Sequence, residues 1–385
     1  MLSLLLPVIY LAFISLGLPD SILGSAWPTM YGPLGADISW AGGLSMLIAG
    51  GTILSSLASD RVIRRFGTGP VTAVSVAMTC AGLFGFSVSR SYLQLCLWCV
   101  PYGLGAGSVD AALNNFVALH YKARHMSWLH CFWGIGATAG PAILGLCLAA
   151  GGDWRTGYGS IGWIQLGLVA LLLFTLPAWK KTAAPAAEAG RSARLTLADT
   201  LSLLGAKPVL VSFFCYCALE STAGLWACSW LVLCKEVPAE TAAGWGALFY
   251  LGITLGRGLS GFITGRLGDS NMVRLGILTA LAGAVVISLP VPGAFAAAGL
   301  VLIGLGYAPI YPSMLHQTPE NFGAKHSQSV MGLQMACAYV GSTFVPPAFG
   351  LLAGAGATRL YPAVLLAIAG VMLAATERVR RLHGR

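Results

Sequence analysis

The chain has 385 residues, of which 57% are hydrophobic and only 9% charged, with a mean hydropathy of +0.78. Soluble domains carry about 25% charged residues, so this composition excludes an ordinary soluble enzyme. The formal net charge of +9 would suit an acidic partner such as nucleic acid. The positions of the basic residues decide whether the positive charge reflects such a partner or the orientation of the chain in a membrane.

Twelve apolar stretches follow one another along the chain, each close to the roughly 20 residues that a helix needs to cross a membrane. The predicted spans lie near residues 5–26, 38–59, 69–89, 91–118, 128–150, 157–178, 208–233, 241–264, 272–289, 293–315, 327–353 and 358–376. Fifty glycines suit such a bundle, since small residues let membrane helices approach closely. The sequence therefore predicts an all-α membrane protein of twelve transmembrane helices.

The basic residues separate by side of the membrane. With a cytoplasmic N-terminus, 17 of the 22 Lys and Arg residues fall on the cytoplasmic side, four fall on the other side, and Arg257 lies within a span. This bias is what the positive-inside rule requires. We therefore expect a multi-pass protein of the cell (inner) membrane with both termini cytoplasmic, and no nucleic-acid partner.

A polar segment divides the chain into two halves. Residues 180–206 are rich in Ala, carry charges of both signs and separate six spans from six. We expect a six-helix bundle over 1–179, a cytoplasmic linker over 180–206 and a second six-helix bundle over 207–385. The LTLADTLSLL part of the linker is typical of a short amphipathic helix on the membrane surface.

The two halves share motifs at an offset near 200 residues. Asp20-Ser-x-x-Gly24 matches Glu220-Ser-x-x-Gly224, Gly103-Leu-Gly matches Gly304-Leu-Gly, and Pro141-x-x-x-Gly matches Pro346-x-x-x-Gly. Four correspondences in register, including a turn at an Asp with basic neighbours after spans two and eight, indicate pseudo-symmetric bundles. That architecture is typical of transporters that bind their substrate between two halves.

Ionisable residues inside the spans are few: Asp20, Asp110, His130, Glu220 and Arg257. Placing an Asp, Lys or Arg at the centre of a membrane helix costs of order 2.5–3.5 kcal/mol, so such residues are functional candidates by default. The structural alternative is a polar network that holds helices together. Asp110 and Asn114 share a helix face, and His130 is expected to approach that face as a hydrogen-bonding partner.

The polar and aromatic residues of the spans suit a sugar. Hydroxyl-rich substrates are bound by acids and amides, with an aromatic ring against their apolar face. The predicted substrate-binding residues are Asp20, Asn114, Asn115, His130, Trp133, Glu220, Trp226, Tyr307, Tyr311 and Gln334. Any one intramembrane ring is also compatible with simple packing.

Arg257 has no acid close to it in sequence. It either pairs with Glu220, which would make that acid structural, or extends towards the cytoplasm. The sequence contains no metal-ligand spacing, nucleophile elbow or nucleotide-binding motif, and the GLGAG at 103–107 lacks the strand and Lys-Ser/Thr of a phosphate loop. We expect no cofactor, no metal and no catalytic residue.

The layout resembles the major facilitator superfamily. The turns at Asp60-Arg61 and at Gly265-Arg266-x-Gly268-Asp269 are similar to its gating motif, and with Arg257 these residues are the predicted gate. GLGAGSVDAALNN (103–115), LHCFWGIGATAGP (129–141), ESTAGLW (220–226) and GLGYAPIYPSM (304–314) resemble the fucose permease group of sugar/proton symporters.

This resemblance implies binding and coupling roles for carboxylates in spans one and four, here Asp20 and Asp110. The family has Glu at the span-four position, whereas Asp110 is shorter. With Glu220, these residues are the predicted proton-coupling set.

The leading hypothesis is a monomeric secondary carrier of a monosaccharide or polyol with proton symport. One alternative is a proton-coupled exporter of drugs or metabolites, and another is a transporter-like sensor or membrane enzyme.

Overall fold

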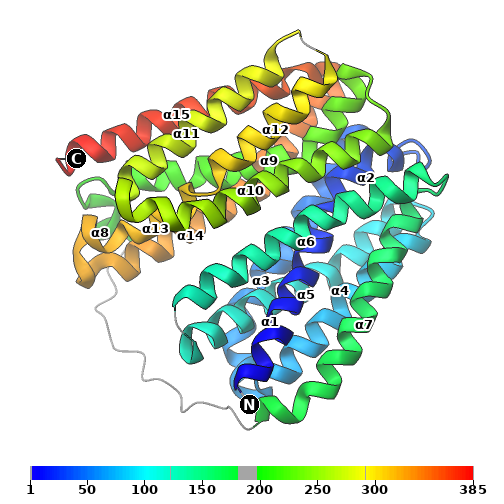
Figure 1. Ribbon diagram of the computed structural model, residues 1–385, viewed down its shortest axis with the longest axis horizontal. Coiled ribbons are helices and arrows are strands. Elements are labelled where there is room, and N and C mark those ends of the chain that lie inside the picture. Colours follow the sequence, from blue (N-terminus) through cyan, green and yellow to red (C-terminus); the bar gives the residue numbers. More distant parts are fainter. Residues whose placement is uncertain (1, 122, 181–196, 291, 385) are drawn as a thin grey trace.

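A computed structural model describes residues 2–121, 123–180, 197–290 and 292–384, and over these ranges every regular element is a helix and none is a strand. Helices dominate because lipid offers no hydrogen-bonding partner, so each spanning segment must satisfy its backbone groups internally. Figure 1 shows α1–α7 grouped on one side and α9–α15 on the other. The two groups approach each other near α2 and spread apart towards the ends marked N and C.

The first group begins close to the N-terminus and ends at residue 180. Its helices are α1 (Leu2–Asp20), α2 (Ile22–Met30), the 3-10 turn η1 (Ile38–Trp40), α3 (Ala41–Phe66), α4 (Thr68–Val88), α5 (Tyr92–His120), α6 (Ala123–Ala149) and α7 (Trp154–Lys180). Of the predicted linker 180–206, residues 181–196 lie outside the described ranges. The short helix α8 (Leu197–Ser202) follows them.

The second group repeats the arrangement. It consists of α9 (Ala206–Lys235), α10 (Ala239–Leu267), α11 (Asp269–Ser288), α12 (Gly293–Tyr307), α13 (Ile310–His316), α14 (Thr318–Leu352), the short turns η2 (Ala353–Ala357) and η3 (Thr358–Leu360), and α15 (Tyr361–Leu382). Each of the twelve predicted spans corresponds to one helix or one pair of consecutive helices.

Hydropathy supports the membrane assignment. Ten stretches of the described residues are long and apolar enough to span a membrane, and the last of them, Ser329–Leu382, includes both α14 and α15. The 29-residue helix α5 is not among the ten, although it packs against α3 and α4 in the first group. The all-α membrane fold predicted from the sequence is confirmed.

Two predicted spans are interrupted in the middle. The first breaks at Ser21, directly after Pro19 and Asp20, and the tenth breaks between Tyr307 and Ile310, at Pro309. A proline removes a backbone donor and disfavours helical geometry in the residue before it, which explains both positions. The break in the first span places Asp20 at a helix end.

Two short turns between neighbouring helices depend on glycine. Gly67 joins α3 to α4 with φ of 83°, and Gly268 joins α10 to α11 with φ of 74°. Residues with a Cβ avoid this region, so a one-residue reversal requires glycine. Gly67 follows the first predicted gating segment and Gly268 lies within the second, so the two turns occupy equivalent places in the two groups.

The two groups pack most closely at one end, which we call the closed end, and α6 and α10 extend that contact towards the middle of the molecule. At the closed end α2 packs against α9, and a Cβ added to Gly24 would collide with the carbonyl oxygen of Gly224 and lie 2.8 Å from Leu225 Cα. The motif copies recognised in the sequence therefore touch each other. The opposite end, which holds α8 and the C-terminus, is the open end.

Candidate functional site

A cavity of about 820 Å³ lies between the two groups of helices. It reaches the open end at Asp269, the first residue of α11, and at His316, the last residue of α13, whose side chain is 73% exposed. The lining residues most relevant to binding are Asp110, His130, Trp133, Tyr216, Glu220, Arg257 and Tyr311. The cavity is thus a one-ended vestibule that collects most of the ionisable residues predicted inside the spans.

Glu220 and Arg257 form an ion pair within this cavity. An Arg257 Nη atom lies 3.6 Å from Glu220 Oε1, and the two side chains are 16% and 22% exposed, respectively. Of the two possibilities that the sequence left open for Arg257, the structure adopts pairing. The pair is neutral overall, which lowers the cost of holding each charge in a partly desolvated place.

Arg257 also connects the two halves through an aromatic ring. Its guanidinium carbon lies 5.1 Å from the ring centre of Trp133 on α6, a distance at which cation and ring attract. The Trp133 indole nitrogen in turn donates a hydrogen bond of 2.9 Å to Asp20 on α1, whose side chain is exposed. A chain of contacts, Asp20–Trp133–Arg257–Glu220, therefore joins α1 and α6 to α10 and α9.

Asp110 has a neutral partner. The Asn114 amide donates to Asp110 Oδ1 at 2.9 Å, which is the contact that their four-residue spacing predicts. Within the described ranges, neither Asp110 nor Asp20 forms an ion pair. The three acids thus differ: Glu220 is balanced by a cation, whereas Asp20 and Asp110 are held by an indole and an amide.

His130 and Tyr311 complete the polar lining. His130 is exposed in the cavity, one turn before Trp133 on α6, and its ring meets Phe13 edge-on at 6.0 Å. Tyr311 on α13 donates its hydroxyl to the sulfur of Met335 at 3.2 Å. Trp133 and Tyr311 are therefore the two predicted rings that face the cavity.

Asp20 and Asn114 do not line the cavity themselves, but each is hydrogen-bonded to a lining residue, Trp133 and Asp110 respectively. Three further predicted binding residues lie elsewhere. Trp226 is fully buried and donates to the Pro346 carbonyl at 2.9 Å, Tyr307 is 1% exposed in the core, and Gln334 is fully buried against Thr318. We therefore leave these residues out of the site, because their polar atoms are directed into helix packing. Asn115 belongs to α5, and its side chain lies outside the described set.

The placement of Trp226 yields a first prediction. We expect Trp226→Phe to lower the free energy of unfolding by about 1–3 kcal/mol, because the buried Pro346 carbonyl loses its donor. Substrate affinity should not change, since the ring lines no part of the cavity. Thermal unfolding and ligand binding measured on the same preparation test both halves of this expectation. A loss of affinity at unchanged stability would return Trp226 to the binding site.

The structure describes most, but not all, of the residues predicted to form the gate. Arg61 and Arg266 are exposed, the Asp60 side chain is outside the described set, and Asp269 accepts a hydrogen bond of 2.6 Å from His316. His316 was not among the predicted site residues, because no motif in the sequence includes it. Tyr216 was also missed, although its position one turn before Glu220 on the same helix could have indicated it.

Asp269, His316 and Glu320 bring possible metal-ligand atoms within 4.8 Å of one another. Two of the three are exposed, and the Asp269–His316 hydrogen bond already accounts for their proximity. We assign no metal to this group. Its members come from three helices, so no spacing in the sequence would reveal it.

The sequence of this chain is similar to those of known membrane transporters. The sequence profile of the Major Facilitator Superfamily matches residues 9–346 and 235–382 of this chain. An uncharacterized transporter, y4wD of Sinorhizobium fredii (strain NBRC 101917 / NGR234), is 24% identical over 359 residues, which cover 89% of this chain and 90% of that protein.

Solved structures share the fold. A mutant of the peptide transporter POT superposes with a TM-score of 0.76 at 16% sequence identity, covering 98% of this chain and 95% of that one. A D-xylose-proton symporter superposes with a TM-score of 0.70 at 15% identity, covering 96% of each chain. At these identities the likeness concerns the fold and leaves the substrate open.

Proposed function

This chain belongs to the Major Facilitator Superfamily, and on that premise we propose that it is a proton symporter of a monosaccharide or related polyol. Membership of this family directly supports secondary transport. The substrate class and the coupling ion are our proposal. The observation that carries it is the different pairing of the three acids inside the spans, Asp20, Asp110 and Glu220.

The unequal pairing of the acids suggests which of them carry protons and which contact the substrate. Asp20 and Asp110 are held by neutral donors, so loss or gain of a proton changes the net charge of the cavity lining at Asp110, or directly behind Trp133 at Asp20. Glu220 has Arg257 within 3.6 Å, which neutralises it without a proton. We therefore propose Asp20 and Asp110 as the coupling acids and assign Glu220 and Arg257 to substrate contact and cavity structure.

The cavity chemistry suits a polyhydroxylated ligand. The Trp133 ring offers an apolar face, while Glu220, Arg257 and Asp110 offer acceptors and donors around it. The fold is also that of a D-xylose-proton symporter. A ligand in this place contacts both groups of helices, which is what a carrier needs in order to be exposed to each side alternately.

The open end is assigned to the cytoplasm. The last turns of α3 and α15 carry Arg64, Arg65, Arg380 and Arg381 at that end, in keeping with the positive-inside rule. In this assignment the structure is inward-facing, with the contact between Gly24 and Gly224 sealing the outer side.

The coupling assignment predicts a separation of two activities. Asp20→Asn and Asp110→Asn should each abolish uphill accumulation of substrate, because an amide side chain neither binds nor releases a proton. Exchange of substrate across the membrane should persist. The measurement is counterflow and proton-driven uptake in proteoliposomes, with an uncoupler as the zero point. A substrate is first identified by thermal shift of the purified protein against sugars and polyols, because ligands that bind the native state raise its apparent stability.

The matched control is Glu240→Gln, which removes one negative charge from an exposed position in the first turn of α10. Its accumulation should equal that of the wild type. If Asp20→Asn and Asp110→Asn both still concentrate substrate normally, the coupling proposal fails.

The size of the cavity favours a second candidate. A volume of about 820 Å³, with Phe13, Leu315 and Met331 in its lining, would also admit the larger apolar cargo of a proton-coupled exporter. Deletion of the gene separates the two: an exporter leaves cells more sensitive to toxic compounds, whereas an importer leaves them unable to use its substrate.

A further inference from the structure

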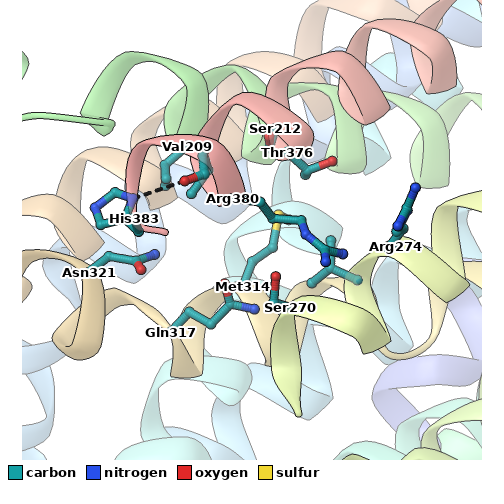
Figure 2. Close-up of a pocket in the computed structure, with 12 residues that line it drawn as sticks. Val209, Ser212, Ser270, Arg274, Met314, Gln317, Asn321, Thr376, Arg380 and His383 are labelled. Atoms are coloured by element: carbon teal, nitrogen blue, oxygen red, sulfur yellow. Dashed lines mark hydrogen bonds between the residues drawn. The ribbon is translucent and has the colours of Figure 1, made fainter. Parts of the chain in front are cut away.

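A second pocket lies at the open end, entirely within the second group of helices. It is about 30 Å³ in volume and shares no lining residue with the central cavity. The first turn of α9, the start of α11, the junction of α13 with α14, and the end of α15 surround it (Figure 2). Its polar lining consists of Ser212, Ser270, Arg274, Gln317, Asn321, Thr376, Arg380 and His383.

Several polar atoms around this pocket have no partner in the described structure. They are Nη1 of Arg380, Nε2 of Gln317 and Oδ1 of Asn321, all of them removed from solvent. The Gln317 side chain as a whole is only 8% exposed. An unsatisfied buried polar group costs about 1–3 kcal/mol, and more when it is charged, so two donors and one amide oxygen in one place indicate a missing occupant.

The charge around the pocket favours an anion. Arg274 is already paired with Glu377, at 3.0 Å, and within the described ranges no acid forms an ion pair with Arg380. Ser270 is the second residue of α11, whose N-terminus has no side-chain cap and therefore presents free N–H groups and a partial positive charge. The carboxylate of Asp269 is engaged by His316 at 2.6 Å.

The geometry brings the donors together. Figure 2 shows the Gln317 amide, the Ser270 hydroxyl and the Arg380 guanidinium group around the same space. A guanidinium fork matches the oxygens of a phosphate group, and an amide and a hydroxyl supply the further donors that such a group accepts. The Asn321 amide completes the set, since it can present either its oxygen or its nitrogen.

We propose that this pocket binds a phosphate group. The pocket is too small for a whole metabolite, and two sources share the chemistry of a phosphate group: the headgroup of a phospholipid and free inorganic phosphate. Bound there, the group would tie α11 and α15 to the α13–α14 junction. Ser270 and Gln317 directly follow Asp269 and His316, so the site lies beside the mouth of the central cavity.

Thermal unfolding of the purified full-length protein tests the proposal. In detergent, inorganic phosphate is compared with chloride at equal ionic strength; in lipid nanodiscs, phosphatidylcholine alone is compared with a mixture containing phosphatidic acid. We expect at least one of these phosphates to raise the Tm by several degrees. Stabilisation in detergent identifies free phosphate as a source, and stabilisation in nanodiscs alone identifies the lipid headgroup.

Two substitutions on α15 provide the matched comparison. Arg380→Gln should abolish the shift, whereas Arg378→Gln, which removes the same charge from an exposed position on the same helix, should keep it. Equal shifts in both variants would mean general charge screening and would overturn the site. The absence of any shift in the wild type with either phosphate source would overturn it as well, and would leave buried water as the occupant.

A third substitution tests the site in a variant that is expected to remain folded. Gln317→Glu keeps the shape of the side chain and supplies a carboxylate next to Arg380 from within the protein. We expect this variant to have a raised Tm without phosphate and no further response to it. A Gln317→Glu protein that still responds to phosphate like the wild type would contradict the proposal. These assays do not involve transport, so they stand or fall independently of the proposed function.

Discussion

Replacing Arg257 with Met is expected to abolish most transport and to destabilise the protein. The substitution leaves Glu220 without its counter-ion and removes the cation from the face of Trp133, so both sides of the contact chain between the halves are lost. Removing one partner of a fully buried pair costs 3–5 kcal/mol and of an exposed pair less than about 1 kcal/mol. Because these side chains are 16% and 22% exposed, we expect roughly 2 kcal/mol.

The control for this experiment lies on the same helix. Arg266→Met removes an exposed Arg from the last turn of α10 and should leave stability and substrate affinity near the wild type. The double variant Arg257→Met with Glu220→Gln should regain most of the lost stability, because no uncompensated charge remains, but not the lost affinity. Thermal unfolding and substrate binding of all four proteins give the answer. If the double variant is no more stable than Arg257→Met alone, the lost stability does not come from an uncompensated charge on Glu220.

The sequence predicted the helices well because the membrane makes the signal simple. Every span must be apolar over about 20 residues and helical, so hydropathy alone locates it. Within one helix the spacing rule also held: Asp110 and Asn114, four residues apart, are hydrogen-bonded as expected. The loop charges also predict which end of the molecule faces the cytoplasm, through the positive-inside rule.

The site was harder to predict because its contacts join distant segments. In a soluble protein, polarity marks the outer face of a helix, but here the lipid-facing and core-facing sides are both apolar. Nothing in the periodicity distinguishes Trp226, buried in the core, from Trp133, which lines the cavity. The pairing of Glu220 with Arg257 depends on how α9 packs beside α10. The hydrogen bond between His316 and Asp269 likewise links α13 to α11.

Gly24→Ala is expected to drive the carrier from the inward-facing state to the outward-facing state. The new methyl group would collide with the Gly224 carbonyl and lie 2.8 Å from Leu225 Cα, both of them backbone atoms that cannot turn away. Overpacking of this kind costs about 1–3 kcal/mol, and the cost applies only while the closed end stays closed. Every 1.4 kcal/mol is about a tenfold change in an equilibrium constant, so the populations should shift by roughly 10- to 100-fold.

The native Cys217, which lines the central cavity, reports this shift. In intact cells, a membrane-impermeant maleimide should label Cys217 faster in Gly24→Ala than in the wild type, as measured by peptide mapping. Mapping is needed because Cys234 is exposed in the last turn of α9 and will react in every variant.

Two further glycines separate a conformational effect from simple damage. Gly244→Ala places its methyl group in open space and should change nothing, whereas Gly136→Ala meets Leu18 N at 3.0 Å inside the first group of helices. That second collision persists however the halves rock, so Gly136→Ala should lower stability without exposing Cys217. Faster labelling in Gly24→Ala alone is therefore the result that rocking requires. Equal labelling in Gly24→Ala and the wild type would mean that the contact between Gly24 and Gly224 is not the outer seal.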